Sequence, residues 1–202
     1  MSYGSDRSFT DKVHQTVALR EVYNPLHWKE KEVDQAELEY VDIHHGIDYI
    51  FENSNDYTIS VQERFREERY HVYNDCTLRY RRDSNKDESR HESEFYKIEA
   101  DCLVYGILNQ SKKEIILNKS QDNLSFKKYV VVNISILKEK IKEGRIIIAK
   151  GENRSYINRD GKMVVPVKDN FDSSSSFVAF DVKQLQKLFG DEGIIIKQFG
   201  YY

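Results

Sequence analysis

The chain has 202 residues, of which 39% are hydrophobic and 12% aromatic, and its formal net charge is -3 at pH 7. This length and aromatic content suit a single globular domain and exclude a disordered polyelectrolyte. A net charge of -3 gives no overall attraction for nucleic acid, so phosphate binding would need a local basic patch.

The sequence contains no run of about 18 apolar residues, and its first six residues lack the basic and then apolar order of a secretory signal. We therefore expect a cytoplasmic protein with no membrane partner. Its two cysteines, Cys76 and Cys102, form no CxxC pair and have no nearby Cys/His spacing that would indicate a zinc site. Both are predicted to be reduced and structural.

A helix is predicted over residues 8–21. It starts at a capping box in Ser8-Phe9-Thr10-Asp11, and Phe9, Val13 and Val17 follow one another at i+4 spacing. Asn24-Pro25 ends it, and the charged residues 29–39 are predicted to form a solvated connection.

Strand-like alternation begins at residue 41 and predicts a hairpin of residues 46–51 and 57–66, joined by the turn formers of residues 52–56. In the second strand, one face is predicted to be apolar and the other polar. The apolar face holds Tyr57, Ile59, Val61 and Phe65, and the polar face holds Thr58, Ser60, Gln62, Arg64 and Arg66.

The later elements predict an α/β or α+β fold with a central mixed β-sheet flanked by helices. Further strands are predicted at residues 76–81, 100–108, 114–117, 129–132, 145–150 and 194–198, with helices at 134–143 and 182–189. Residues 83–92 are predicted to be a polar loop, and residues 151–176 a long excursion with at most one weak strand at 163–167. We expect one domain, with a core of residues 8–150 and a C-terminal extension of residues 151–202 packed on it.

The predicted hairpin brings together side chains that suit phosphodiester hydrolysis. That reaction needs a metal to activate water and carboxylates to hold the metal. Asp48 lies on the first strand, and Gln62 and Arg64 share one face of the second because they are two residues apart. Three polar side chains are therefore expected to converge.

This hairpin resembles the signature of the PD-(D/E)XK, or restriction-endonuclease-like, nuclease superfamily. Gly46-Ile47-Asp48 is followed, after thirteen intervening residues, by Gln62-Glu63-Arg64. The pattern is most similar to the Mrr-like and archaeal Holliday-junction-resolvase-like branches, in which Gln can replace the second acid. The segments 78–80 and 95–106 also resemble these nucleases, so the likeness covers roughly residues 8–150.

The resemblance implies that Asp48 is the main ligand of Mg²⁺ or Mn²⁺ and that Gln62 is a second ligand through its carbonyl oxygen. Arg64 would occupy the position of the lysine. Two departures matter, because Gln62 brings no charge to the metal, and because Arg64, with a pKa above about 12, stabilises a phosphorane but does not readily act as a base.

A further carboxylate would compensate for the neutral Gln62. Glu21 continues the ridge of Phe9, Val13 and Val17, and related resolvases have a helix-borne glutamate beside the hairpin. Glu39 and Asp42 compete for this role. We expect Glu21 as the extra metal ligand and catalytic residue.

Arginines after the proposed site are predicted to contact nucleic acid, because basic residues interleaved with aromatic ones suit a phosphate-lined groove. They are Arg66, Arg69, Arg79 and Arg81. Acidic residues lie among them, so a surface of salt bridges is an equal alternative.

These features predict a Mg²⁺-dependent endodeoxyribonuclease acting on duplex or branched DNA, working as a homodimer because two-fold symmetry suits two strands. The small size is typical of phage, viral or mobile-element proteins. If the protein is viral, we expect it in the cytoplasm of the host cell. The alternative is a non-catalytic nucleic-acid-binding or assembly protein that keeps the nuclease fold.

Overall fold

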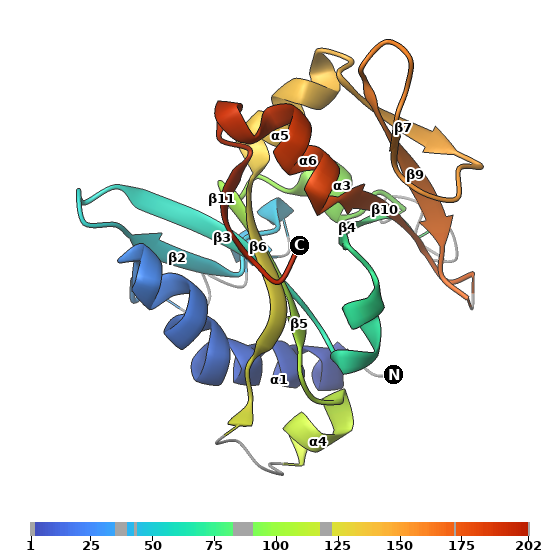
Figure 1. Ribbon diagram of the computed structural model, residues 1–202. Coiled ribbons are helices and arrows are strands. Elements are labelled where there is room, and N and C mark those ends of the chain that lie inside the picture. The colour runs from blue at the N-terminus through green and yellow to red at the C-terminus, as the bar shows by residue number, and fades with distance from the viewer. Residues whose placement is uncertain are drawn as a thin grey trace.

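Two mixed β-sheets flanked by helices make up the protein, as seen in the computed structural model (Figure 1). The structure describes residues 3–34, 40–42, 44–82, 91–117, 123–171 and 173–201. The predicted mixture of helices and strands is confirmed, but two sheets are present where one central sheet was expected.

The first sheet has six strands in the order β1-β2-β3-β5-β6-β11. They are β1 (Lys29–Glu30), β2 (Tyr49–Glu52), β3 (Thr58–Arg66), β5 (Cys102–Leu108), β6 (Phe126–Asn133) and β11 (Ile195–Phe199). Strands β3 and β5 are parallel, and the other neighbours are antiparallel. This sheet carries the predicted hairpin as β2 and β3.

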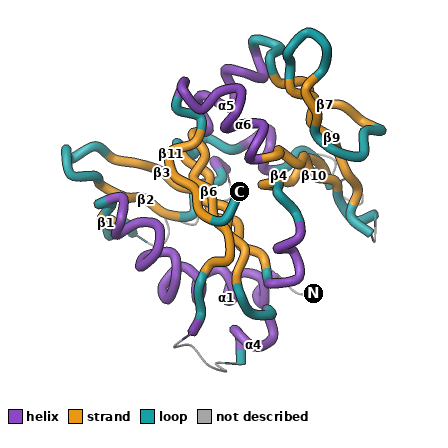
Figure 2. Tube along the Cα trace, viewed as in Figure 1, coloured by secondary structure: helices purple, strands orange, loops and turns teal. Residues whose placement is uncertain are grey.

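The second sheet has the order β4-β10-β9-β7, with β8 paired to β9. Its strands are β4 (Asp75–Arg81), β7 (Ile146–Lys150), β8 (Tyr156–Ile157), β9 (Met163–Asp169) and β10 (Ser176–Asp181). Strands β7 and β9 are parallel. Figure 2 shows this sheet beside the first one, with α5 and α6 at one end of both.

Helices cover the sheets and connect their strands. They are α1 (Tyr3–Val13), the π-helix η1 (His14–Tyr23), η2 (Asn24–Leu26), η3 (Glu68–Val72), α3 (Glu94–Lys97), α4 (Lys112–Ile116), α5 (Ile134–Lys142), α6 (Val182–Phe189) and η6 (Gly190–Glu192). The predicted helix of residues 8–21 lies within α1 and η1, but its expected start at Ser8 is wrong, because α1 already begins at Tyr3 and Ser8 lies inside it. No helix in these described parts of the chain is both long and apolar enough to span a membrane.

Two apolar cores lie on the two faces of the six-stranded sheet, because successive side chains of a strand point to opposite faces. On one face, Leu103 and Tyr105 of β5 share a core with Leu78 and Phe180 of the second sheet. On the other face, Val61, Val104 and Phe51 pack with residues of α1 and η1. Strand β5 therefore contributes side chains to both cores, and the sheet separates them.

The strand expected to begin at residue 41 is wrong in its first part. Residues 40–42 and 44–45 are helical, and β2 starts only at Tyr49. Gly46 ends this helical turn with φ 61°, and Gly46 N donates a hydrogen bond to Asp42 O. A residue with left-handed backbone angles is typical of the end of a helix. The sequence before Gly46 alternates like a strand, so the helical turn was not predicted.

The strand predicted at residues 114–117 is also wrong, because this segment belongs to helix α4. Ser111 caps the helix: its side chain accepts from Glu114 N while the Glu114 carboxylate accepts from Ser111 N. These two hydrogen bonds satisfy the backbone amides of Ser111 and Glu114, which in a β-strand would need acceptors on a neighbouring strand.

Residues 151–176 contain more regular structure than predicted. Strand β9 is largely buried and lies inside the second sheet, and β10, which the sequence analysis missed, pairs with both β9 and β4. Strand β11 then completes the first sheet. Residues 151–202 thus supply strands to both sheets.

Candidate functional site

Asp48 lies at the start of β2, directly beside Gln62 of β3. The pairing of Tyr49 with Val61 sets this register, and Asp48 N donates to Val61 O over 2.8 Å. Asp48 Oδ2 accepts two hydrogen bonds of 2.6 Å, from Gln62 Nε2 and from Glu63 N. The hairpin therefore brings Asp48 and Gln62 together, as the strand parity indicated.

Gly46 lets the chain approach this pair closely. A Cβ at this position would lie 3.1 Å from Gln62 Oε1 and 3.4 Å from Ile98 Cα. Both the positive φ and this close approach favour glycine. Gly46 thus fixes how the chain enters β2 just before Asp48.

Arg64 lies on the same face of β3 as Gln62 and is held by Glu94 of α3. Arg64 Nη1 donates to Glu94 Oε2 over 2.7 Å, and Arg79 of β4 donates to the same carboxylate through its backbone N (3.0 Å). Burial would raise the pKa of Glu94, but the charges of Arg64 and Arg79 outweigh it and lower that pKa to about 2. Burial lowers the pKa of Arg64 to about 10, so its guanidinium stays charged at neutral pH.

The four arginines predicted to bind nucleic acid occupy two places. Arg79 of β4 forms an ion pair with Glu94. Arg81, at the end of the same strand, pairs through its backbone with Glu92 in an isolated β-bridge. Arg66 and Arg69 both lie against the ring of Tyr70, at 5.5 and 5.1 Å from its centroid.

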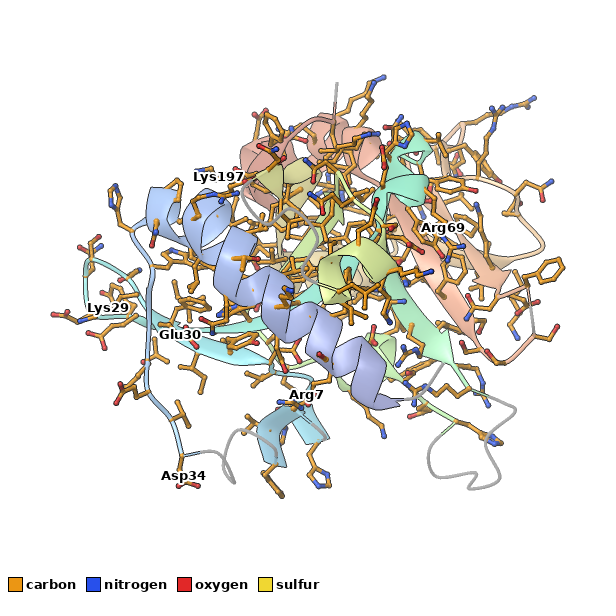
Figure 3. The ribbon with its side chains drawn as sticks, turned by 90° about the horizontal axis from the view of Figure 1, so that it is seen from below. Arg7, Lys29, Glu30, Asp34, Arg69 and Lys197 are labelled. Carbon is orange, nitrogen blue, oxygen red and sulfur yellow. The ribbon has the colours of Figure 1, made fainter. Side chains whose placement is uncertain are left out.

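Arg69 also forms an ion pair with Glu67, 2.7 Å away. Figure 3 shows Arg69 at the end of the molecule opposite Lys29 and Glu30. Acidic partners thus lie beside these arginines, as the alternative of a surface of salt bridges predicted.

Glu21 does not lie beside Asp48. Its Oε2 accepts from Phe126 N at the start of β6, and its Oε1 accepts from Arg20. Two strands, β3 and β5, separate β6 from β2. The expected meeting of Glu21 with the hairpin site is thus not present in the structure.

The π-helix explains this displacement. Its hydrogen bonds run from residue i to i+5, so its turns are longer than those of an α-helix. The buried side chains accordingly fall at Val17 and Ala18 and then at Val22 and Tyr23. Glu21 therefore does not lie on the buried face of the helix, where an i+4 spacing predicted it.

Other carboxylates come closer to Asp48. Burial raises the pKa of Asp48 well above its ordinary value, and the charges of Asp42, Glu63 and Glu94 raise it further. Asp42 forms an ion pair with Arg7, 2.8 Å away. The other competitor, Glu39, lies outside the described residues.

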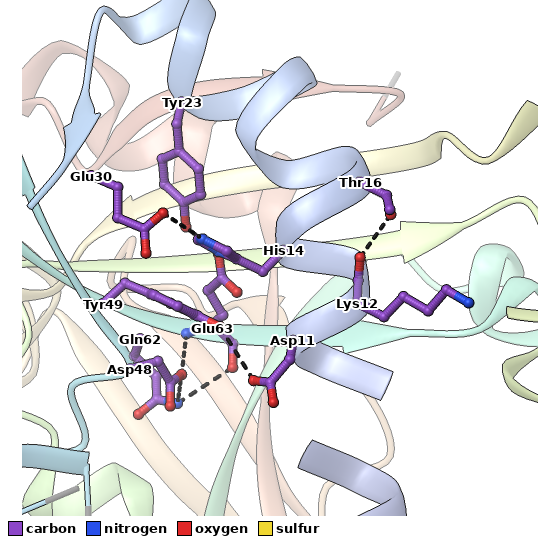
Figure 4. A network of polar contacts seen from close by, with 10 residues as sticks. All are labelled: Asp11, Lys12, His14, Thr16, Tyr23, Glu30, Asp48, Tyr49, Gln62 and Glu63. Carbon is purple, nitrogen blue, oxygen red and sulfur yellow. Dashed lines mark hydrogen bonds and ion pairs between the residues drawn. The ribbon is translucent and has the colours of Figure 1, made fainter. Parts of the chain in front are cut away.

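Glu63 points to the opposite face of β3, into a closed polar network (Figure 4). Glu63 Oε1 accepts from Tyr23 Oη (2.5 Å) and lies 2.8 Å from His14 Nδ1. His14 Nε2 lies 3.3 Å from Glu30 Oε2. Since Glu63 N also donates to Asp48, one residue joins this network to the hairpin site.

His14 is the centre of the network. Its ring is stacked on that of Tyr49, with centroids 3.6 Å apart. Burial lowers the pKa of His14, but the hydrogen bond and charge of Glu63 outweigh burial and raise it overall. Burial raises the pKa of Glu63, although His14 and Tyr23 oppose this.

Two residues of these clusters were missed by the sequence analysis. Glu63 interrupts the apolar series of Val61 and Phe65, and a charge in such a series is a signal for a buried partner. Glu94 had no such signal, because it lies at the start of a four-residue helix and reaches Arg64 only through the tertiary fold.

The donor set at Asp48 suits Mg²⁺ shared with a phosphate rather than a cage made by protein alone. Mg²⁺ is usually bound by one or two carboxylates together with substrate oxygens. Within the described residues, no three His, Cys, Asp or Glu side chains are grouped to hold a metal. Asp48 and Gln62 are the two side chains that would hold it, provided the Gln62 amide turns its oxygen toward the ion.

Comparison of the chain with models of known protein families, with curated proteins and with solved structures found no significant match. The function of the site is therefore inferred from its own geometry.

Proposed function

We propose that the protein is a metal-dependent DNA endonuclease of the restriction-endonuclease-like type, with its site at Asp48. The observation that carries this proposal is the contact of Gln62 with Asp48 on one face of the hairpin. Arg64 follows on the same strand face but is bound to Glu94 and not to Asp48, so the expected meeting of three polar side chains is reduced to two. A carboxylate, an amide and a fixed cation are side chains that phosphodiester hydrolysis uses.

Each residue has a distinct part in this proposal. Mg²⁺ or Mn²⁺ bound at Asp48 and Gln62 would activate water and neutralise charge on the phosphate. Arg64 stabilises the negative charge that develops on the phosphate oxygens, and Glu94 holds its guanidinium in place. Water adds to phosphorus and the bond to one ester oxygen breaks, leaving a phosphomonoester and a hydroxyl.

The charges around Glu94 support a phosphate partner. Arg64, Arg66 and Arg79 all lower the pKa of this one carboxylate, so three guanidinium groups lie near a single acid. The carboxylates of Asp42, Asp48 and Asp75 lie near the same groups, so the three guanidinium groups are a local source of cations and not a strongly positive patch. We propose duplex or branched DNA as the substrate and a homodimer as the working form.

One observation favours a second candidate, a nucleic-acid-binding protein without activity. The nitrogen of Gln62, and not its oxygen, faces Asp48, and Glu63 N occupies the same carboxylate oxygen. A carboxylate satisfied by two donors is stable without a metal. In this case the arginines would bind DNA and no bond would break.

The two candidates are separated by incubating the protein with supercoiled plasmid and with a four-way junction, in Mg²⁺, in Mn²⁺ and in chelator. We expect metal-dependent cleavage by the wild type and a loss of at least 100-fold in Asp48→Asn, about the effect of one strong transition-state interaction. Asn keeps the shape of Asp48 and can accept from Glu63 N, so the fold is expected to survive.

The matched control is Asp191→Asn, which removes one negative charge from an exposed position in η6. It should cleave as the wild type does. Wild-type protein that shifts DNA on a gel but leaves every substrate intact would establish the second candidate, and full cleavage by Asp48→Asn would show that the site lies elsewhere.

A further inference from the structure

An apolar pocket lies beside the Asp48 site, between α3, β4 and α5. Its volume is about 260 Å³, below the roughly 300–1,000 Å³ of most ligand pockets, so it suits one ring system rather than a large cofactor. Its lining includes Leu78, Phe95, Tyr96, Ile98 and Leu137.

The pocket and the site share walls. Helix α3 directs Glu94 toward Arg64, while the next two residues, Phe95 and Tyr96, line the pocket. Ile98 also lines the pocket, and its Cα lies 3.4 Å from the Cβ position of Gly46, which in turn is next to Gln62 Oε1. Ile98 thus contacts both the pocket and the segment that leads into Asp48.

Aromatic rings form one side of the pocket. The rings of Tyr80, Phe95 and Tyr96 lie 5.2 to 5.3 Å apart, and Phe95 and Tyr96 meet edge to face. Tyr96 is 40% exposed, so one ring of this cluster is open to a ligand. Such a cluster offers a surface on which a flat ring can stack.

The charged residues that line the pocket are both cations. Lys138 and Lys142 of α5 are exposed, and Lys138 Nζ donates to Ile98 O. Arg81 and Glu92 lie near Tyr96 and oppose each other in charge. An apolar pocket that is aliphatic for the most part, with two aromatic rings on one side and a basic rim, is complementary to a flat base attached to phosphate.

We propose that this pocket binds an unpaired nucleobase of a DNA strand whose phosphates reach Lys142 and the arginines around Glu94. This inference rests on the proposed nuclease function and names its substrate class, DNA with at least one unstacked nucleotide. A base within a duplex is stacked and cannot enter, so single strands, branch points and distorted sites are preferred.

The test measures binding in chelator, apart from cleavage. A single-stranded oligonucleotide carrying a fluorescent base analogue, whose emission falls on stacking, is titrated with wild type, Tyr96→Ala, Tyr96→Phe and Tyr73→Ala. Tyr73 is 52% exposed and lies outside the pocket, which makes it the matched control.

We expect the wild type to bind the single strand more tightly than the matching duplex. Tyr96→Ala should weaken that binding about 10-fold and remove the loss of emission, while Tyr96→Phe and Tyr73→Ala should behave as the wild type does. Lys142→Gln should lower the slope of log K against log salt concentration by about 0.7, the loss of one phosphate contact.

Two binding results would overturn the proposal: equal affinity for single strand and duplex, or undiminished quenching of the base analogue in Tyr96→Ala. A third is displacement of the oligonucleotide by an equal concentration of free deoxynucleoside monophosphate, because the pocket would then bind a single nucleotide and not a strand. Cleavage is scored separately in Mg²⁺. If the wild type binds as expected but never cleaves, the pocket stands and the nuclease proposal fails; if it cleaves without any effect of Tyr96→Ala, the nuclease proposal stands and the pocket fails.

Discussion

Strand β3 carries ionisable side chains on both of its faces, and the surroundings of these side chains differ. On one face, Arg64 is 13% exposed and its partner Glu94 is 20% exposed. On the other face, the side chains of Glu63 and His14 are both completely buried. The first pair is open to an outside group, and the second is closed to it.

The two faces also differ in whether an outside group can pair with their ionisable side chains. Arg64 Nε and Glu63 Oε2 are both buried atoms that have no partner among the described residues. The side chain of Arg64 keeps some exposure, so an anion at the site would contact its terminal nitrogens and not the buried Nε. For Glu63 no space is open, so its charge is balanced by His14 and Tyr23 alone.

Chain position alone does not mark a functional charge. Residues 62, 63 and 64 are consecutive, yet their side chains alternate between the two faces of the sheet, which are covered by different cores. We infer that the Gln62 and Arg64 face acts on a substrate, and that Glu63 supports the hairpin from behind.

The largest effect is expected for Glu63→Ala. Removing this carboxylate leaves His14 and Tyr23 buried without their acceptor, so the free energy of unfolding should fall by about 3–5 kcal/mol. Urea denaturation measures this change. Asp191→Ala, at an exposed position, serves as control and should stay within about 0.5 kcal/mol of the wild type. An equally small change in Glu63→Ala would show that the network contributes no stability.

A smaller effect is expected on the open face, for Glu94→Gln. Without the carboxylate, Arg64 loses its orientation, and cleavage should fall about 10- to 100-fold, as for groups that orient a ligand. Binding of DNA in chelator should be unchanged or tighter, because one negative charge is removed from a cluster of arginines. A parallel loss of binding and of folded protein would instead indicate a purely structural role for Glu94.

The smallest effect is the dependence of stability on pH that His14 contributes. Its pKa is raised in the folded protein, so the folded state keeps the proton above pH 6.5, the value of the unfolded chain. This stabilisation is complete below about pH 6.5 and is lost as the pH rises through the raised pKa. The pKa of the buried Glu63 is also raised, so its contribution to stability likewise falls as the pH rises, but over a range that begins at lower pH.

Denaturation of wild type and of His14→Gln between pH 6 and pH 9 measures this contribution. The advantage of the wild type should shrink as the pH rises, while parallel curves for the two proteins would contradict a role for the His14 charge. Protons can reach His14 through Glu30, which lines a surface hollow of about 590 Å³ beside β1.

The hairpin and the faces of its strands follow from the sequence. Alternation from residue 58 to residue 66 set which side chains share a face, and the turn formers of residues 52–56 set the register that places Asp48 beside Gln62. Both are local properties, decided by neighbours along the chain and across one turn. The helices of residues 134–143 and 182–189 were predictable for the same reason. The placing of Tyr57 on the apolar face is wrong, because it precedes β3 and is 68% exposed.

Tertiary packing set which distant residues join the hairpin. Glu94 reaches Arg64 because α3 packs against β4, and Glu21 misses the site because the π-helix changes the phase of its buried face. The second sheet likewise depends on pairing between β4 and β10, which are about 100 residues apart in the sequence. Long-range pairing of this kind is set by packing and not by local periodicity, so the contact of Glu94 with Arg64 could not be predicted from the sequence.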